Sequence, residues 1–335
     1  MLAKLYRKFI PQNIRKNIYR AFLGKWLLTL RNYVTEPLKA KYYTLLFFFR
    51  KPRNEEEKAL HEWAIVGPCP YPYLWVKEYR NGRAFALSSN LLASSKEFHL
   101  MEGGGKHLKN RGLKDAHVYY QNNLPYVLHK GQRLFFKKGM SAKLVRENYL
   151  GLLIEQDKRS AHCYVNDYAE MEGRTLLDVG SAEGIFTLDT IEHIRHAYLF
   201  ESEDMWIEAL HATFEPWKEK ITIVKKYVSD TDDEQNLCLD TFFRDKPTDH
   251  LFLKMDIEGY ERKALNGARH LLATAESIAG AVCIYHKKDD PQVIGQILTD
   301  TGMTFEQTPG YLYMSRELRP GVIRFTSPAK RNTRS

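Results

Sequence analysis

The stretch Leu176–Gly184, LLDVGSAEG, decides the fold. Its apolar start predicts a buried strand, Gly180 lets the chain turn tightly after it, and Gly184 opens the next helix. The spacing is D-x-G-x-x-x-G, which differs from the G-x-G-x-x-G of dinucleotide-binding folds. Because glycines in such a turn let a ligand approach the backbone, the turn is a candidate ligand site. Its candidate contacts are Asp178, Gly180, Ser181, Ala182, Gly184 and Phe186.

Two further segments place polar groups at the ends of expected strands. Glu201 and Ser202 follow AYLF about twenty residues later, and a carboxylate there can accept both hydroxyls of a ribose. Residues 221–228, ITIVKKYV, predict another strand, and Ser229 and Asp230 follow it, where an adenine edge could be read. Three successive strand ends therefore carry groups suited to a ligand that contains adenosine.

Short apolar runs alternate with amphipathic segments from Thr175 onward. Such alternation predicts an α/β fold, a Rossmann-like, doubly wound, mostly parallel sheet with ligands at the carboxyl ends of its strands. The expected strands are 175–180, 197–201, 221–228, 250–256 and 278–286, the expected helices are 183–194, 203–217, 261–273 and 291–302, and residues 304–308 and 311–315 are expected to close the domain as a strand pair.

A helical and hairpin extension is expected before this domain. Asn81-Gly82 and Lys130-Gly131 are hairpin-turn signals, and Ser141 is a candidate N-cap. Residues 101–112 resemble a mobile loop and lack the G-K-[ST] ending of a phosphate loop. The expected parts of the chain are a basic amphipathic arm (1–55), an α+β extension that forms a substrate wall (56–165), a ligand-binding domain (166–316) and a basic tail (317–335).

The positive charge is concentrated at the start of the chain. Residues 1–53 hold thirteen Lys or Arg and one acid, Glu36, so they carry +12 and leave −3 of the total +9 for the other 282 residues. An aromatic and aliphatic stripe beside these basic residues is typical of a helix on an anionic membrane surface. A helix packed on its own domain, with its basic side in solvent, is the alternative. No run approaches the roughly 18–20 apolar residues of a membrane span, and no secretion signal is recognisable.

The four cysteines indicate the compartment. They lack a C-x-x-C pair, which argues against a disulfide framework and a structural zinc site. A reducing, cytoplasmic setting is therefore expected, at the inner membrane face if the arm binds lipid. Hydrophobic residues make up 44% of the 335, which suffices for a large core.

The stretch LKMDIEGYE crowds three carboxylates behind a buried strand. Asp256 and Glu258 are candidate catalytic residues, because crowded carboxylates raise one another's pKa and then suit a proton acceptor. Asp256 is also a candidate contact for the cofactor. Glu261 is explained by the favourable placement of an acid in a first helical turn. A divalent ion would need a third ligand, Asp230 or His286, and no metal is assigned.

His286 ends the next expected strand and is the third candidate catalytic residue. A histidine can take a proton from a hydroxyl near neutral pH, although histidines also cap strand ends. The place after the fourth strand reads DIEG and lacks the Asn/Asp-Pro-Pro-Tyr turn of enzymes that methylate nucleic-acid bases. No nucleic-acid partner is therefore expected.

The motifs together resemble class I S-adenosylmethionine-dependent methyltransferases, and within them the FkbM family. The resemblance covers roughly residues 120–315, through LLDVGSAEGIFTL, LFESE, LKMDIEGYERKALNGA and IYH, with the helix and His-x-Tyr of YLGLLIEQDKRSAHCYV before them. It implies S-adenosylmethionine as the cofactor and methyl transfer to a hydroxyl. Two positions depart from the family: Lys226 and Tyr227 stand where small or amide residues are usual, and Tyr285 stands where Glu is frequent.

The expected function is O-methylation of a carbohydrate or a related metabolite in polysaccharide or glycolipid synthesis. The partners are then a hydroxyl-bearing acceptor and, through residues 1–53, an anionic membrane surface. Two other classes remain open: a non-catalytic Rossmann-like interaction module, and an enzyme for another adenosine-containing ligand such as NAD. The missing G-x-G-x-x-G argues against NAD, and the presence of Asp178, Gly180 and Glu201 argues against a non-catalytic module.

Overall fold

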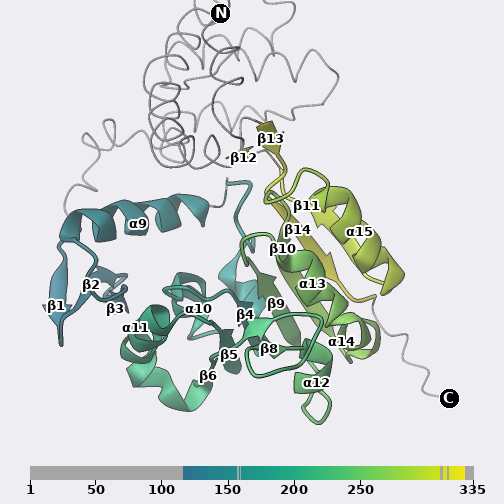
Figure 1. The fold of residues 1–335 in the computed structure, drawn as a ribbon, viewed down its shortest axis with the longest axis horizontal. Coiled ribbons are helices and arrows are strands. Elements are labelled where there is room, and N and C mark those ends of the chain that lie inside the picture. Colours follow the sequence, from purple (N-terminus) through teal and green to yellow (C-terminus); the bar gives the residue numbers. More distant parts are fainter. Residues whose placement is uncertain (1–115, 157, 159, 310–311, 315–316, 329–335) are drawn as a thin grey trace, which may run out of the picture. The chain divides into compact units, whose positions relative to one another are not determined.

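A computed structural model describes residues 116–156, 158, 160–309, 312–314 and 317–328 (Figure 1). The predictions for the basic arm, for the Asn81-Gly82 hairpin and for the loop 101–112 lie outside the described residues. Within the described part of the chain, no helix is both long and apolar enough to cross a membrane.

A seven-stranded sheet forms the centre of the described part. Its order is β11-β14-β10-β9-β4-β5-β6, in which β10, β9, β4, β5 and β6 run parallel and β14 lies antiparallel to both neighbours. The bounds are β4 Thr175–Val179, β5 His196–Phe200, β6 Ile221–Val224, β9 Leu251–Met255, β10 Ile278–Cys283, β11 Thr304–Gln307 and β14 Val322–Thr326. The prediction of a mostly parallel, Rossmann-like sheet is confirmed.

Helices cover both faces of this sheet, as the alternating strand and helix patterns predict. Buried side chains of α10 and α11 pack with one set of strand residues, whereas those of α12 to α15 pack with the other set (Figure 1). Successive residues such as Leu176 and Leu177 belong to opposite cores, because side chains alternate across a strand. The bounds are α10 Ile185–Thr190, α11 Asp204–Phe214, α12 Leu239–Phe242, α13 Glu261–Asn266, α14 Arg269–Thr274 and α15 Asp290–Asp300.

A hairpin and a helix precede the sheet. The strands β1 Tyr119–Gln121, β2 Leu124–His129 and β3 Gln132–Phe135 form a separate three-stranded sheet, with the expected turn at Lys130-Gly131. The helix α9 Ala142–Glu155 follows, and the Ser141 hydroxyl accepts a hydrogen bond from the amide of Leu144 at 3.3 Å, as expected of an N-cap. A short helix, η5 Tyr168–Met171, leads into β4.

The segment 221–228, expected as one strand, is two. The chain turns after β6, where the Lys226 amide donates to the Val224 carbonyl at 2.9 Å. It then forms the short strand β7 Tyr227–Val228, which pairs with β8 Asn236–Leu237 in a sheet of its own. Ser229 and Asp230 therefore follow β7 and do not sit at the end of a central strand.

The segment 261–273, expected as one helix, is also divided. The break lies at Gly267, where an added Cβ would meet the Ser229 carbonyl oxygen at 1.9 Å. The amides of His270 and Leu271 donate to the Asp240 carboxylate at 3.1 and 2.7 Å, which satisfies the start of α14. Only glycine, which has no side chain, lets the chain at this break lie so close to the backbone of Ser229, in the segment that follows β7.

Gly267→Ala is expected to lower the free energy of unfolding by about 2 kcal/mol, because the new methyl group must displace backbone. The matched control is Gly151→Ala in α9, where nothing lies within 4 Å of the added methyl. That change should raise the stability by about 0.5–1 kcal/mol, since alanine favours a helix. Urea unfolding of both variants checks the opposite signs, and equal effects would contradict the close approach.

The C-terminal strands pair differently from the expectation. β11 pairs with β14 at the edge of the central sheet, whereas β12 Leu312–Met314 pairs with β13 Glu317–Arg319. The predicted pairing of 304–308 with 311–315 is therefore wrong. The sheet also continues beyond residue 316, because β14 fills the position between β10 and β11. The apolar Val322, Ile323 and Phe325 of β14 are buried, and this short pattern was missed.

Candidate functional site

A cavity of about 870 Å³ opens at the carboxyl ends of β4, β5 and β9. This is the edge at which ligands bind in open α/β sheets. Its wall includes all but three of the predicted site residues. The predicted residues that line it are Asp178, Gly180, Ser181, Ala182, Phe186, Glu201, Ser202, Ser229, Asp256 and Glu258. Gly184, Asp230 and His286 do not line it, although Gly184 belongs to the turn that does.

The glycine turn is fixed between two neighbouring strands. The amide of Gly180 donates to the Phe200 carbonyl at 3.0 Å, at the end of β5. Gly180 has φ +77°, and a Cβ there would meet the Asp256 carbonyl oxygen at 2.0 Å, at the end of β9. Gly184 has φ +79° and packs against Phe214 and Leu210 of α11. Both glycines are therefore required, one by close backbone approach and both by their left-handed conformation.

Glu201 connects this turn to the end of β5. Its Oε2 accepts the Ala182 amide at 3.0 Å, and its Oε1 accepts the amides of Ser202 and Glu203 at 2.7 and 2.9 Å. The carboxylate is thus held on the cavity wall in one orientation. Oε1 already accepts two amides, so the remaining lone pair lies on Oε2, where it can accept a further donor such as a ribose hydroxyl.

Asp178, predicted as a cofactor contact, has structural partners. Its Oδ2 accepts the Thr187 hydroxyl at 2.6 Å, and its Oδ1 forms an ion pair with the Lys254 ammonium at 2.9 Å. Both side chains of that ion pair are buried. Asp178 therefore positions the glycine turn against β9, and Lys254, which the motifs did not single out, neutralises its charge.

The segment after β7 forms a different part of the cavity wall. Ser229 is buried there and donates to the exposed Asp230 at 3.3 Å. Sequence reasoning missed three polar residues that line the cavity beside Ser229. They are Thr231, Gln235 and Asn236. No motif marks them, because the β7–β8 pairing that brings them there has no sequence signal.

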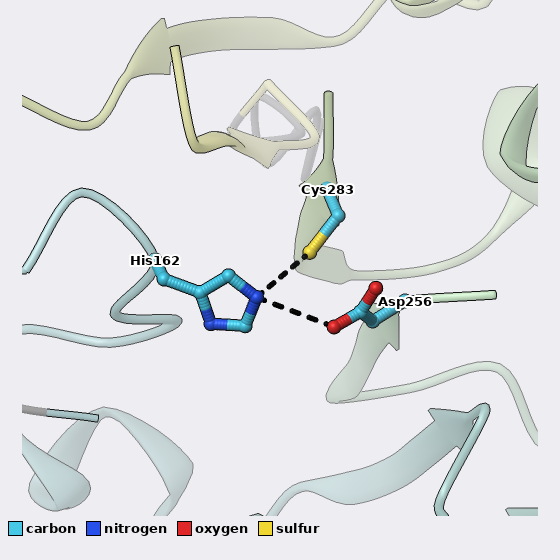
Figure 2. A group of neighbouring side chains, drawn as sticks. All are labelled: His162, Asp256 and Cys283. Atoms are coloured by element: carbon cyan, nitrogen blue, oxygen red, sulfur yellow. Dashed lines mark hydrogen bonds and ion pairs between the residues drawn. The ribbon is translucent and has the colours of Figure 1, made fainter. Parts of the chain in front are cut away.

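Asp256 is the centre of a polar cluster at the floor of the cavity. Its Oδ2 accepts the Tyr164 hydroxyl at 3.1 Å and lies 3.3 Å from His162 Nε2, while its Oδ1 accepts the Tyr285 hydroxyl at 3.3 Å. Figure 2 shows one ring nitrogen of His162 facing both Asp256 and Cys283, and the Cys283 Sγ lies 3.6 Å from this nitrogen. His162 and Tyr164 are the His-x-Tyr of the family resemblance, which was the available signal for them.

The charge of Asp256 is stabilised by its surroundings. Burial alone raises the pKa of this carboxyl, but the hydrogen bond and charge of His162 and the charges of Lys254 and His286 hold it well below its usual value. The expectation that crowded carboxylates raise the pKa of Asp256 is therefore wrong. Its nearest charged neighbours are cationic.

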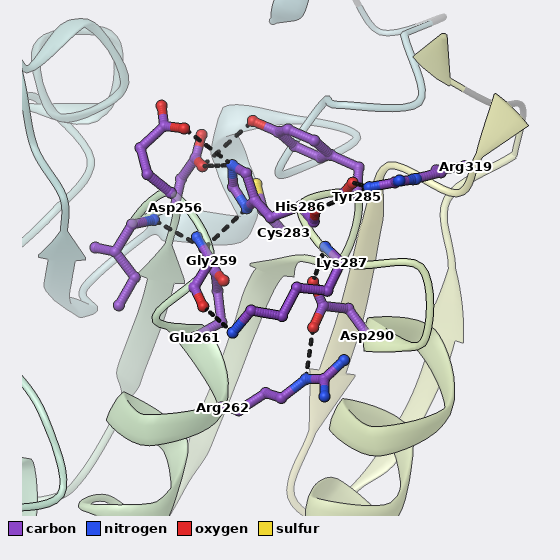
Figure 3. A network of polar contacts seen from close by, with 12 residues as sticks. Asp256, Gly259, Glu261, Arg262, Cys283, Tyr285, His286, Lys287, Asp290 and Arg319 are labelled. Atoms are coloured by element: carbon purple, nitrogen blue, oxygen red, sulfur yellow. Dashed lines mark hydrogen bonds and ion pairs between the residues drawn. The ribbon is translucent and has the colours of Figure 1, made fainter. Parts of the chain in front are cut away.

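Glu261 and His286 lie behind this cluster (Figure 3). The fully buried Glu261 accepts the amides of Ile257 and Gly259 at 3.0 and 3.2 Å and lies 3.0 Å from His286 Nδ1. The role expected for Glu261, a helix start, is thus only part of its contribution, because it also shapes the turn after Asp256 and orients His286.

His286 faces the two other candidate carboxylates through its second nitrogen. Its Nε2 lies 3.6 Å from Asp256 and 3.5 Å from Glu258, whose side chain is 91% exposed. Burial lowers the pKa of His286, but the hydrogen bond to Glu261 and the charges of Glu261, Asp256 and Glu258 raise it overall. The structure therefore brings the three predicted catalytic residues together. Asp256 and Glu258 line the cavity, whereas His286 lies behind them.

Two triplets bring three potential metal-ligand atoms within 4.8 Å of one another among the described residues. They are His162, Asp256 and Cys283, and Asp256, Glu261 and His286. Hydrogen bonds and ion pairs within each triplet account for the short distances. Of the two third ligands considered from the sequence, His286 lies in a triplet and Asp230 does not.

Two carboxylates in the cavity wall were missed, the half-buried Glu155 and the buried Glu183. Glu155 ends α9, and Glu183 precedes Gly184 in the glycine turn. Burial raises the pKa of Glu155, and burial raises the pKa of Glu183 to about 7. Glu183 lies in a quoted motif, whereas nothing in the sequence indicates that α9 directs Glu155 into this cavity.

Glu183→Gln is expected to stabilise the ligand-free protein at about pH 8 but not near pH 4.5. The folded-state pKa of about 7 lies above the ordinary value of 4.5, so the protonated carboxyl favours folding at low pH and its ionisation opposes folding as the pH rises through 7. The upper limit of the difference is roughly 3 kcal/mol. Unfolding of both proteins across this pH range measures it, and a pH-independent difference would exclude the shifted titration.

The sequence of this region also matches the model of a known protein family. Residues 142–298 match the model of the methyltransferase FkbM domain. This part of the chain is an FkbM-type methyltransferase domain. The match begins with α9 and ends within α15, so it contains the glycine turn, Glu201, Asp256 and His286. Comparison with curated proteins gave no significant match.

Solved structures with similar folds include several methyltransferases. A methyltransferase FkbM from Methylobacillus flagellatus KT is 18% identical with a TM-score of 0.37, over 54% of this chain and 53% of that one. A precorrin-6y C5,15-methyltransferase from Geobacter metallireducens GS-15 is 12% identical with a TM-score of 0.33, over 48% and 84%. Magnesium protoporphyrin IX methyltransferase from Synechocystis PCC 6803, solved with bound SAM, is 14% identical with a TM-score of 0.33, over 47% and 72%. This chain thus spans about half the length of the first of them.

Proposed function

We propose that this protein transfers a methyl group from S-adenosylmethionine to a hydroxyl of a carbohydrate or related metabolite. The observation that carries the proposal is the placement of the glycine turn, Glu201 and Asp256 around one cavity at the carboxyl ends of β4, β5 and β9. These residues belong to the FkbM-type domain. The cavity, at about 870 Å³, is large enough for a nucleoside cofactor and part of an acceptor.

The residues present fit this cofactor. Glu201 is held by the amides of Ala182, Ser202 and Glu203, with one lone pair left on Oε2 for a ribose hydroxyl. The close approach of Gly180 to Asp256 brings backbone of both elements to the cavity wall, where the methionine half would lie. Ser229, Thr231, Gln235 and Asn236 line the remaining wall and offer donors and acceptors to an adenine edge.

The cofactor, when bound, supplies an electrophilic methyl group, so the protein must position the acceptor and accept one proton. Asp256 is held ionised and can accept a hydrogen bond from the acceptor hydroxyl. Tyr164 and Tyr285, which share Asp256, fix the direction of its free lone pairs. Glu258 extends the polar surface of the cavity, and His286 lies behind it with its imidazole held in place by Glu261.

An acceptor at an anionic membrane surface would explain the basic arm. This part of the proposal depends on the +12 charge of residues 1–53 alone. Flotation of vesicles of phosphatidylcholine with and without phosphatidylserine, with the full chain and with a form lacking residues 1–53, tests it. Equal flotation of both forms would remove the membrane from the proposal.

The acceptor class is tested by radiolabel transfer from methyl-labelled S-adenosylmethionine. The probes are methyl glycosides, total cellular glycolipid, tRNA and a denatured protein mixture, each with Asp256→Asn as the blank. Label in glycosides or glycolipid supports the proposal. Label only in tRNA or protein would contradict it, and the absence of cofactor binding would leave an interaction module as the explanation.

A further inference from the structure

Glu155 lies outside the strand and helix repeat that forms the cofactor side of the cavity. It is the last residue of α9, the helix that precedes the central sheet. Its half-buried side chain lines the same cavity as Tyr164, Asp256 and Tyr285. Glu155 therefore reaches the Asp256 end of the cavity from the side of α9, the wall expected to face the acceptor.

The Glu155 carboxylate forms no hydrogen bond or ion pair with any other residue that the structure describes. The neighbouring carboxylates differ in this respect. Asp178 is paired with Lys254, Glu201 accepts three backbone amides, and Asp256 contacts four side chains. The Glu155 side chain is half-buried and lines the cavity without such a partner, so a ligand bound in the cavity can donate a hydrogen bond to it.

The other acid and base groups are less suited to take a proton. The pKa of Asp256 is held low by His162, and a weakly basic carboxylate is a poor proton acceptor. His286 does not line the cavity. Glu183 lies within the glycine turn, on the cofactor side. Burial raises the pKa of Glu155 and outweighs the opposing charge of His162, which brings its basicity closer to the need of a reaction at neutral pH.

We propose that Glu155 faces the transferred methyl group and accepts the proton of the acceptor hydroxyl. In this step the hydroxyl oxygen forms a bond to the methyl carbon, the carbon–sulfur bond breaks and its electron pair remains on sulfur, and the proton moves to Glu155. The inference rests on the proposed function. It adds that the proton acceptor comes from α9 and that Asp256 positions the hydroxyl.

A binding experiment tests this without knowledge of the acceptor. In sinefungin, a carbon that bears an ammonium group replaces the methylated sulfur, so its charge lies where the methyl would be. A carboxylate that faces the methyl should form an ion pair with this ammonium, which S-adenosylhomocysteine lacks. Calorimetry with both compounds is done on the wild type, Glu155→Gln, Glu183→Gln and the control Glu147→Gln, an exposed residue of the same helix.

The wild type and Glu147→Gln should bind sinefungin at least about ten-fold more tightly than S-adenosylhomocysteine. Glu155→Gln should reduce this preference to about two-fold or less and leave the affinity for S-adenosylhomocysteine within about two-fold, which also shows that the variant is folded. A preference retained in Glu155→Gln, or lost only in Glu183→Gln, would overturn the inference. A folded wild type that binds neither compound would instead overturn the proposed function itself.

Discussion

Asp256→Asn is expected to lower the free energy of unfolding by about 3 kcal/mol, besides abolishing methyl transfer. The substitution removes the negative charge that lies 3.3 Å from His162 and 3.6 Å from His286 and that faces Lys254. His162 then remains buried without this counter-charge, whereas Lys254 keeps its ion pair with Asp178 and His286 keeps Glu261. The effect should be largest near neutral pH, because both histidines have raised pKa values that depend on Asp256.

Urea unfolding at about pH 7 measures this loss. Glu258→Gln is the matched control, since it removes a carboxylate from the same turn that is 91% exposed, and it should change stability by less than about 0.5 kcal/mol. If Asp256→Asn were as stable as the control, the cationic groups around Asp256 would not depend on it for their charge. The account of its low pKa would then fail.

Lys254→Met is expected to cost about 3–5 kcal/mol, the range for removing one partner of a buried ion pair. The Lys254 ammonium lies 2.9 Å from Asp178, and their side chains are 6% and 1% exposed. It also donates to the Gly180 carbonyl at 2.5 Å, so its loss should loosen the glycine turn as well as leave a buried charge.

A double-mutant cycle isolates the ion pair. Lys254→Met combined with Asp178→Asn should recover at least half of the lost stability, because no unpaired charge then remains. Lys143→Met, which breaks an exposed pair with Glu147, should cost less than about 0.5 kcal/mol. Strict additivity of the two buried substitutions would show that Lys254 and Asp178 do not stabilise each other.

Much of the central sheet could be predicted, because its signals are local. The apolar runs before Gly180, Glu201 and Asp256 have the length and composition of buried parallel strands. Each of these three residues lines the cavity. The hairpin at Lys130-Gly131 and the Ser141 cap likewise depend on residues a few positions apart.

The errors concern contacts between residues far apart in the sequence. The break at Gly267 exists because the Ser229 backbone passes within contact of it, and β14 joins the sheet by pairing with β10. Glu155 and Lys254 lie in stretches quoted for the resemblance but were assigned no role, because their position in the cavity depends on how α9 and β9 pack. Local propensity contains no information on such tertiary contacts.

The most direct test of the central claim is titration of S-adenosylmethionine and S-adenosylhomocysteine into the wild type, Glu201→Ala and the control Glu208→Ala, an exposed residue of α11. The account predicts roughly micromolar binding by the wild type and the control, and at least about a 100-fold loss in Glu201→Ala, because the ribose contact is removed. A folded wild type that binds neither compound, or a Glu201→Ala variant that binds both equally well, would contradict the account.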